Sequence, residues 1–313
     1  MPELLSMGEC MIELFSEDSI ETAQTFHKSI AGDSFNIAVA VSRLGSSVGY
    51  ITKLGNDPFE KFIRNSFEKE KFDMSLTLSS KGFNAVHFVA TMPDGNRDFV
   101  YYRKGSSPSN ITPDDLEESH IKKAKIMHCS GISQAISESS RETVLHAAKV
   151  AHSNNVLVSY DPNYRHQLWS PKEAIAAMEE LMPYVDIFLP SAPEDTMALF
   201  NADNPEKIIS ISRNFGVENT LITMGSNGAL VDSKGDMFTV PPYQSDSVID
   251  TTGAGDAFKG GFLHGILEGL DIKKAAEIGN IAAGITITGR GAINSIPYRD
   301  EVYKILNDRM FNG

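Results

Sequence analysis

The segment Asp250–Phe258 reads Asp-Thr-Thr-Gly-Ala-Gly-Asp-Ala-Phe and combines residue types that could transfer a phosphoryl group. Gly253 and Gly255 come just before a predicted helix, and the backbone N–H groups at such a helix start can bind an anion. Asp256 stands beside them, although a carboxylate repels a phosphate. An acid at this place is useful if it takes the proton from an alcohol that attacks the phosphorus. The pattern therefore predicts phosphoryl transfer to an alcohol.

These residues also allow other interpretations. The purely structural interpretation is a glycine turn followed by a helix that an aspartate caps. A dinucleotide-binding fingerprint needs a third glycine where Phe258 stands, which disfavours a dehydrogenase. A Walker loop needs Gly-Lys-Ser/Thr, and the chain does not contain that sequence.

The composition is that of an ordinary water-soluble globular protein, with 41% hydrophobic and 22% charged residues in 313. Lys plus Arg number 28 and Asp plus Glu 41, so the net charge of −13 argues against a nucleic-acid partner or an anionic membrane. Cys10 and Cys129 lie in apolar runs and are expected to be buried, reduced thiols. We find no signal-peptide pattern and no apolar run of membrane-spanning length, and we expect a cytoplasmic protein.

The elements that must position Asp256 alternate regularly between strands and helices. This alternation predicts an α/β fold with a mostly parallel central sheet covered by helices on both faces, and ligands at the carboxyl ends of its strands. We expect residues 1–313 to form a single domain. Strands are predicted at 4–13, 48–54, 124–130, 156–160, 185–189, 220–224 and 229–232, and helices at 33–44, 57–69, 138–154, 171–182, 193–201, 205–215, 256–269, 272–288 and 298–309.

One segment departs from this alternation and predicts a small β-sheet lid. Polar and apolar residues alternate over 86–92, and Pro93-Asp94-Gly95-Asn96 is typical of a turn. Residues 99–103 read as a second strand that runs back along the first, which indicates a hairpin. Because a two-stranded hairpin is marginal alone, we expect it to pair with the residues after Glu9. The lid would comprise about 11–31 and 83–104, and its exposed face would offer a surface for a homodimer.

Polar residues that could bind a substrate stand where predicted strands stop. Arg165 follows the strand at 156–160, and Tyr101 and Arg103 share one side of the returning lid strand. A guanidinium suits a carboxylate or a phosphate, although an exposed arginine is usually just solvated. Gly32 and Asp33 precede a helix and could approach a small polar ligand, or Asp33 could simply cap that helix.

Two glycine loops could lie near a nucleotide. Thr223–Gly228 could let backbone approach a nucleotide or could simply be a turn between strands. Gly289–Ser295 follows a helix and supplies free carbonyls, and Asp250 and Thr252 add oxygen ligands for a hard cation. No Cys/His cluster has zinc spacing, and no nucleophile elbow is present for hydrolysis.

These motifs resemble a known family. Asp250–Phe258 is similar to the C-terminal signature of the ribokinase-like (PfkB) carbohydrate kinases, and Gly32 with Asn36 and Arg43-Leu44-Gly45 resembles the N-terminal one. The similarity covers nearly the whole chain. Within the family it is closest to 2-keto-3-deoxygluconate kinases, through the segments 8–14, 101–106, 161–165 and 168–171. Fructokinases are similar around Asp161-Pro162-Asn163 and Leu168-Trp169.

The resemblance implies a role for each matching residue. Glu194 matches the acid of the family's magnesium motif, in which Ser191 replaces the usual asparagine. The implied sugar contacts are Gly32, Asp33 and Asn36, and those at the acid end of the sugar are Tyr101, Arg103 and Arg165. The implied anion hole is Gly253, Ala254 and Gly255 with Asp256 as base, the nucleotide contacts are Thr223, Gly225, Gly228, Asn280 and Ala283, and the monovalent-cation (K⁺) positions are Asp250, Thr252 and Ser295.

The sequence therefore predicts an ATP-dependent kinase that phosphorylates a primary hydroxyl of 2-keto-3-deoxygluconate. Mg²⁺ would bridge the nucleotide phosphates, and the lid would close to exclude water. A fructokinase or another ribokinase-like sugar kinase is the alternative. A non-catalytic regulator that binds a sugar or a nucleotide on the same fold is a further alternative, against which the presence of Asp256 counts.

Overall fold

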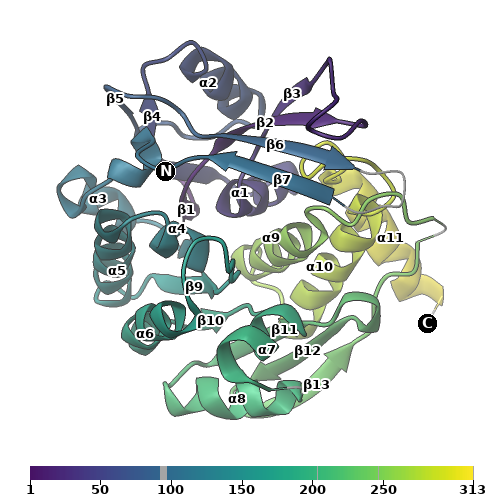
Figure 1. Ribbon diagram of the computed structural model, residues 1–313. Coiled ribbons are helices and arrows are strands. Elements are labelled where there is room, and N and C mark those ends of the chain that lie inside the picture. The colour runs from purple at the N-terminus through teal and green to yellow at the C-terminus, as the bar shows by residue number, and fades with distance from the viewer. Residues whose placement is uncertain (92–96, 203, 246, 313) are drawn as a thin grey trace.

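The computed structural model describes residues 1–91, 97–202, 204–245 and 247–312, and it contains one large and one small β-sheet (Figure 1). The large sheet has nine strands in the order β13-β12-β11-β10-β9-β8-β1-β4-β5. Every pairing from β11 to β5 is parallel, and only β12 and β13 run antiparallel at one edge. The predicted α/β fold with a mostly parallel sheet is confirmed.

The strands of the large sheet follow the predicted apolar runs closely. Two strands were not predicted: β5 reads Thr-Leu-Ser-Ser, which shows little alternation, and β13 is a largely exposed edge strand. The strands are β1 (Leu4–Met7), β4 (Val48–Gly55), β5 (Thr77–Ser80), β8 (Ile126–Ser130), β9 (Leu157–Asp161), β10 (Ile187–Phe188), β11 (Asn219–Thr223), β12 (Ala229–Ser233) and β13 (Asp236–Val240).

Helices cover both faces of the large sheet (Figure 1). Neighbouring residues of β1 belong to two separate apolar cores: Leu4 packs in the core with α1, α9, α10 and α11, and Leu5 packs in the core with α5, α6 and α8. The helices are α1 (Asp33–Arg43), α2 (Glu60–Lys69), α3 (Glu118–Ile121), α4 (Gly131–Ala135), α5 (Glu138–His152), α6 (Pro171–Leu181), α7 (Glu194–Phe200), α8 (Pro205–Asn214), α9 (Ala254–Leu267), α10 (Ile272–Thr286) and α11 (Arg299–Asn312).

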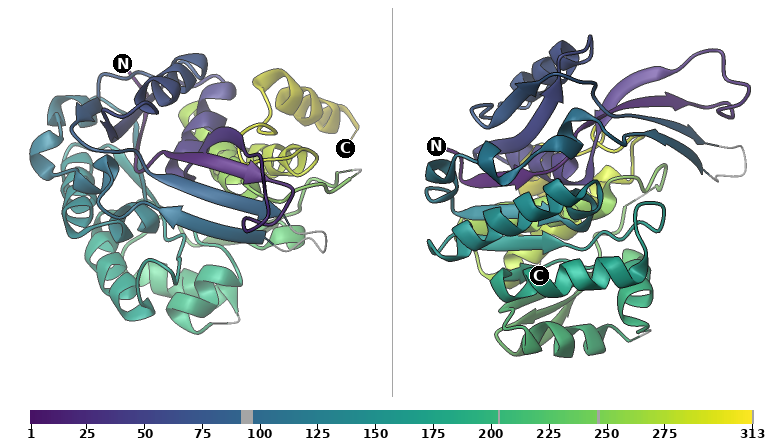
Figure 2. Two further views of the ribbon diagram at one scale, coloured as in Figure 1. Left: turned by 45° about the horizontal axis from the view of Figure 1, so that its top comes forward. Right: turned by 60° about the vertical axis from the view of Figure 1, so that its left-hand side comes forward.

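The small sheet contains β2 (Met11–Ser16), β3 (His27–Ala31), β6 (Val86–Thr91) and β7 (Arg97–Tyr102) in the order β3-β2-β6-β7. β2 pairs with β6 in parallel, so the predicted hairpin does pair with the residues after Glu9. Figure 2 shows this sheet extending away from the large sheet. The predicted turn at Pro93–Asn96 lies outside the described residues.

The expected first strand at 4–13 is divided between the two sheets. Its first part pairs in the large sheet and its second part in the small one, and the buried residues 8–10 join them. A Cβ at Gly8 would lie 2.1 Å from the Ser34 hydroxyl, so a glycine is needed where the chain crosses between the sheets. The division of this strand is a correction of the sequence interpretation.

Arg43 fixes the C-terminal end of α1 to a distant loop. Its guanidinium pairs with Glu70 at 2.7 Å, and the side chains of both residues are only 7% exposed. The remaining nitrogen donates to the carbonyl oxygens of Ile293 and Ile296 at 2.7 and 2.8 Å. The loop after α10 is therefore held against the helix that starts at Asp33.

Both cysteines lie in the interior of the protein. Cys10 and Cys129 are free thiols and both are buried, as predicted. Burial raises the pKa of the Cys129 thiol to about 12, so it stays protonated at neutral pH. Among the helices in the described ranges, none is both long and apolar enough to span a membrane.

Glycines allow α9 and α10 to approach closely. A Cβ at Gly261 would lie 2.9 Å from the Cα of Gly279, and one at Gly265 would lie 2.6 Å from the Cα of Ala275. The obstructing atoms belong to backbone, so a side chain cannot move aside to make room. This contact fixes the direction in which the N-terminus of α9 points.

We predict that Gly261→Ala lowers the free energy of unfolding by about 1–3 kcal/mol, the usual cost of overpacking. The sign is diagnostic, because alanine in an unobstructed helix would instead stabilise by about 1 kcal/mol. Urea unfolding measures the change, with the exposed Lys273→Ala in α10 as control. A variant as stable as the parent would mean that the two helices can separate at little cost.

Candidate active site

The N-terminus of α9 forms an open anion-binding turn. Gly253 precedes the helix in a left-handed conformation with φ of 77°, and a Cβ there would lie 2.5 Å from the carbonyl oxygen of Ala292. Ala254 begins the 14-residue helix, and a Cβ at Gly255 would meet no atom within 4 Å. The first N–H groups of a helix have no carbonyl partners within it and carry partial positive charge. Open space beside them is suited to an anionic group.

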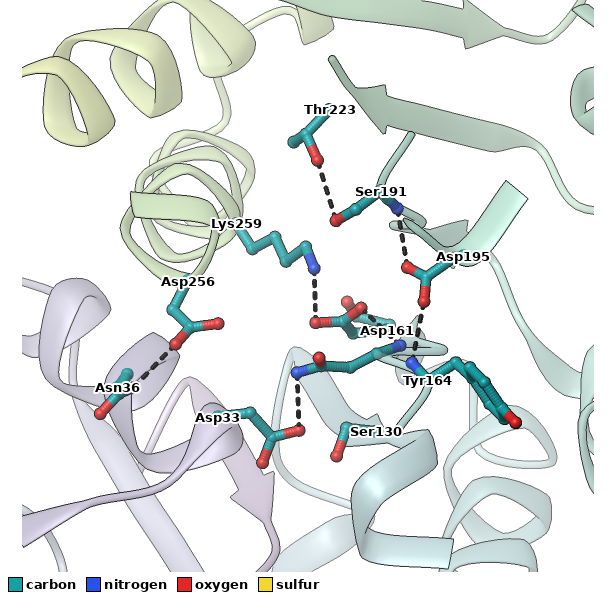
Figure 3. A network of polar contacts seen from close by, with 12 residues as sticks. Asp33, Asn36, Ser130, Asp161, Tyr164, Ser191, Asp195, Thr223, Asp256 and Lys259 are labelled. Atoms are coloured by element: carbon teal, nitrogen blue, oxygen red, sulfur yellow. Dashed lines mark hydrogen bonds and ion pairs between the residues drawn. The ribbon is translucent and has the colours of Figure 1, made fainter. Parts of the chain in front are cut away.

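Asp256 lies in this first turn and points toward α1 (Figure 3). Asn36 of α1 donates from Nδ2 to its Oδ2 at 2.7 Å. Burial raises the pKa of Asp256 to about 6, and the Asp33 carboxylate adds to the effect. The Lys259 ammonium, the Asn36 hydrogen bond and the Arg165 guanidinium act in the opposite direction. A carboxyl group with this pKa is ionised at neutral pH and still basic enough to accept a proton.

The predicted sugar-binding residues gather around this carboxylate. Asp33 accepts a hydrogen bond from Asn163 Nδ2 at 3.2 Å, which links α1 to the segment after β9 (Figure 3). A Cβ at Gly32 would lie 2.3 Å from the carbonyl oxygen of Glu9, so only glycine fits there. Gly32, Asp33 and Asn36 therefore line one side of the space in front of Asp256, although they are 220 or more residues away in sequence.

The lid brings a charged group into the same region. Arg103 Nη2 lies 2.5 Å from Glu9 Oε1, and both side chains are largely buried. In the described part of the chain, the Glu9 carboxylate has no hydrogen-bond partner beyond the Arg103 guanidinium. Burial raises the pKa of Glu9, while the Arg103 guanidinium lowers it. The pair therefore keeps unused donors and acceptors for a polar ligand.

Arg165, predicted to converge with the two lid residues, does lie near them. Burial raises the pKa of the Tyr101 phenol, and the positive charges of Arg103 and Arg165 both oppose this effect. Arg103 also stacks over the Tyr101 ring at 5.5 Å. Arg165 itself is exposed, and its Nη1 donates to the Tyr164 carbonyl. Two guanidinium groups from separate segments thus face one tyrosine.

The predicted nucleotide residues form a second group. Thr223, at the end of β11, donates to the Ser191 hydroxyl at 3.0 Å. Gly225 and Gly228 both have positive φ, and a Cβ at Gly228 would lie 2.2 Å from the Val240 carbonyl oxygen. Asn280 is buried on α10 and donates to the carbonyl oxygens of Val240 and Pro241, and Ala283 is half-buried one turn further.

The residues predicted to bind cations lie in two separate places. Asp250 accepts from Thr252 and from the Gly291 N–H, and Ser295 donates to the Gly291 carbonyl, so these three residues do meet around one loop. Glu194 is exposed in the first turn of α7. Within the described ranges, no three His, Cys, Asp or Glu side chains cluster in a way that could hold a metal.

Sequence reasoning missed three charged residues of the site. Lys259 donates from Nζ to Asp161 Oδ2 at 2.6 Å, and both side chains are almost completely buried (Figure 3). Asp195 accepts from the backbone N–H groups of Tyr164 and Ser191. Lys259 could have been noticed, because it stands three residues after Asp256 and so shares its helix face. No sequence pattern indicated Asp195.

A mostly parallel α/β core, a small β-sheet lid and an aspartate in a glycine-led helix turn define the ribokinase-like class of proteins. Comparison with known families agrees: the model described as "pfkB family carbohydrate kinase" matches residues 1–299. The chain belongs to this family and is a carbohydrate kinase.

Individual relatives extend over almost the whole chain. A 2-dehydro-3-deoxygluconokinase of Bacillus subtilis is 28% identical, with 97% of this chain and 95% of the relative covered. Fructokinase-1 of Zea mays is 32% identical, with 97% of each covered. The crystal structure of an uncharacterised sugar kinase from Pyrococcus horikoshii in complex with ATP superposes with a TM-score of 0.81 at 31% identity, covering 96% of this chain and 97% of that one.

We predict that Asp256→Asn stabilises the protein at pH 8 by about 1–3 kcal/mol and leaves its stability unchanged near pH 4. The pKa of Asp256 is about 6 in the folded protein and 3.8 ordinarily, so the folded state binds the proton more tightly. Its contribution to stability is therefore complete below about pH 4 and is lost as the pH rises through 6.

Urea unfolding at the two pH values tests this, followed by the fluorescence of Trp169, the single tryptophan. Asp18→Asn, an exposed carboxylate, is the control and should change little at either pH. A parent protein more stable than Asp256→Asn at pH 8 would contradict the assigned direction of the pKa.

Proposed function

We propose that this carbohydrate kinase transfers the γ-phosphoryl group of ATP to a primary hydroxyl of 2-keto-3-deoxygluconate, with Asp256 as the general base. The proposal is carried by the position of Asp256, whose carboxylate is held by Asn36 in the first turn of α9 beside the open glycine turn. A proton acceptor and an anion site one residue apart are the two groups that this reaction requires.

In the proposed mechanism, Asp256 accepts the hydroxyl proton as the oxygen attacks the γ-phosphorus. The N–H groups of Gly253 and Gly255 and the positive end of α9 stabilise the negative charge on the transferring oxygens, whereas the Ala254 N–H, also predicted for this anion hole, donates to the Thr251 carbonyl oxygen at 3.2 Å. Asn36 keeps the carboxylate turned toward the sugar by its 2.7 Å hydrogen bond. Catalysis then depends mainly on position and electrostatics, as in phosphoryl transfer generally.

The acid sugar is favoured over a neutral ketose by the charges at the lid. Arg103 and Arg165 both act on the Tyr101 phenol, and Glu9 already offsets the charge of Arg103. Arg165, which has no such ion pair among the described residues and is exposed, is therefore proposed to supply the positive charge for a substrate carboxylate. Fructose carries no group that would pair with it. The sugar-acid kinase among the relatives also supports this choice, while the similar identity to a fructokinase leaves the substrate to experiment.

The proposed nucleotide site lies between Gly225, Gly228 and α10, where Asn280 secures the 240–241 backbone and Ala283 faces the base. ATP in the related Pyrococcus kinase supports this donor. Mg²⁺ usually binds together with the nucleotide phosphates and needs only one or two oxygen ligands from the protein. The carboxylate of Glu194 is exposed and could be such a ligand. The ion would neutralise charge on the phosphates.

Several expectations complete the proposal. The four-stranded sheet acts as the lid of a single domain, and exposed aromatic residues of β7 such as Phe99 and Tyr102 offer the dimer surface. Asp250, Thr252 and Ser295 would belong to a K⁺ site, which a comparison of activity in K⁺ and Na⁺ tests. Buried free thiols suit a cytoplasmic protein.

A coupled assay that follows ADP release across a small panel of sugars tests the substrate directly. We expect the highest kcat/KM with 2-keto-3-deoxygluconate, compared with its C4 epimer, fructose and ribose. A higher kcat/KM with fructose would replace the sugar acid by a neutral ketose. A lack of ADP release with every sugar, despite tight binding of an ATP analogue, would favour the non-catalytic regulator.

We predict that Asp256→Asn lowers kcat by roughly 10²–10⁴, the usual contribution of a positioned base. In the parent enzyme, kcat/KM should fall about tenfold per pH unit below pH 6, because the protonated carboxyl cannot accept the proton. Steady-state kinetics from pH 5 to 9 measure both effects. A folded variant that keeps a third of the parent kcat would exclude Asp256 as base.

We predict that Arg165→Ala raises KM for the keto acid at least tenfold and changes KM for fructose less than twofold. A charge-assisted pair with a carboxylate contributes more than about 1.5 kcal/mol, and fructose cannot form it. The matched control is Arg64→Ala on α2, which pairs with Glu60 and lies outside the site. An equal rise of KM for both sugars would show that Arg165 does not bind the substrate carboxylate.

A further inference from the structure

Lys259 is a buried cation that the proposed mechanism does not use. It follows Asp256 by three residues on α9, so the two side chains leave the same face of the helix. Its side chain is 4% exposed and that of Asp161 is 0% exposed, with 2.6 Å between Nζ and Oδ2. Burying such a pair costs solvation free energy that the attraction often only just offsets. Stability alone is therefore a weak reason for its presence.

Carboxylates from three other elements surround this ammonium and Asp256. Asp161 ends β9, Asp195 lies in α7 and Asp33 begins α1 (Figure 3). Burial lowers the pKa of Lys259, but the carboxylates of Asp161, Asp195 and Asp256 outweigh it and raise the pKa. Lys259 is therefore positively charged throughout the physiological range.

Two more titratable side chains face the group. Arg165, after β9, acts on both Asp195 and Asp256, and His128 lies on β8. Burial, and then the Lys259 charge, lower the pKa of His128 to about 3, so this imidazole is neutral. Arg165 is exposed to solvent, which screens its charge. Of these cations, Lys259 is therefore the one that is buried and charged, and it lies three residues from Asp256 on the same helix.

We propose that Lys259 is a positioning residue for phosphoryl transfer, whose ammonium keeps the Asp256 carboxylate ionised and whose pairing with Asp161 fixes the first turn of α9 against the end of β9. Without this charge, burial and the Asp33 carboxylate would favour the protonated form of Asp256. A protonated carboxyl cannot accept the proton of the sugar hydroxyl. The inference rests on the proposed function, because it concerns Asp256 as the base.

A merely structural bridge between α9 and β9 predicts something different. Its loss would lower kcat or stability at every pH and would leave the shape of the pH profile unchanged. The electrostatic role predicts shifts of opposite sign for the two partners. Removing the ammonium should move the acidic limb of kcat/KM to higher pH, and removing only the Asp161 charge should move it to lower pH.

The experiment measures kcat/KM for 2-keto-3-deoxygluconate from pH 5 to 9, with saturating ATP, in the full-length enzyme. The variants are Lys259→Met, Asp161→Asn and the double variant, which removes both members of this ion pair together. Asp161→Asn keeps an oxygen for the Asn163 N–H, which now donates to Asp161 Oδ1. Lys273→Met, an exposed lysine on α10, is the control.

For Lys259→Met, we expect the acidic limb of kcat/KM to move to higher pH by about one pH unit or more, which is the effect of one nearby opposite charge. At pH 6 this corresponds to about tenfold lower kcat/KM relative to the plateau. In the double variant the loss of the Asp161 charge offsets part of this shift, so its limb should lie between those of the two single variants. Lys259→Arg should restore the parent limb. If the limb moves by less than 0.3 unit (about a 1.5-fold change in activity at pH 6) in Lys259→Met, or if Asp161→Asn moves it to higher pH, the inference is wrong.

The two proposals fail separately. Retained activity in Asp256→Asn would remove the base and with it the proposed mechanism. An inactive Asp256→Asn together with an unshifted limb in Lys259→Met would leave the kinase mechanism intact and reject Lys259 alone. Circular dichroism of each variant shows whether the compared proteins are folded.

Discussion

The repulsion among carboxylates at one edge of the large sheet is the constraint on which the site depends. Asp33, Asp161, Asp195 and Asp256 come from four elements and meet where parallel strands end. Burial makes the negative charges of Asp161, Asp195 and Asp256 costly. The structure meets this constraint with one buried ammonium, with amide donors from Asn side chains and with backbone N–H groups. As a result, the pKa of Asp256 is raised to about 6, so that the carboxylate can accept a proton and is still ionised at neutral pH.

A short crossing at residues 8–10 joins the large sheet to the small sheet beside these carboxylates. The chain leaves β1 at Met7 and enters the small sheet at Met11, so Glu9 is buried at the junction and faces the lid arginine. Helix α1 follows directly after β3 and brings Asp33 and Asn36 to the same region. The lid residues and the residues around Asp256 are therefore joined by short stretches of chain.

The sequence predicted the parts of the fold that rest on local pattern. Alternating apolar runs located most strands and helices to within a few residues, and a capping box of Ser170 with Glu173 starts the helix at Pro171. The edge strands β5 and β13 were missed because exposed, short strands carry little apolar signal. The division of the first strand depends on a contact between Gly8 and Ser34, which no local pattern encodes.

For the site, the motifs located groups that act through backbone geometry, such as Gly253 and Asp256, because few residue types fit those conformations. The ion pairs of Lys259 with Asp161 and of Arg103 with Glu9 join residues about 100 positions apart, so they were found only in three dimensions. Spacing alone can place a residue on a helix face, but it does not reveal which partner that face meets.

The close approach of Gly253 to the Ala292 carbonyl has a consequence for mutagenesis. The turn before α9 and the loop after α10 touch through main-chain atoms, at a distance that leaves no room for a Cβ. Truncation of Arg43 or Asp250 to alanine would remove side-chain bonds to this loop, but it would leave the contact between Gly253 and Ala292 itself intact. That contact would be tested by perturbations of the main chain, such as an ester in place of an amide or a residue inserted into the loop.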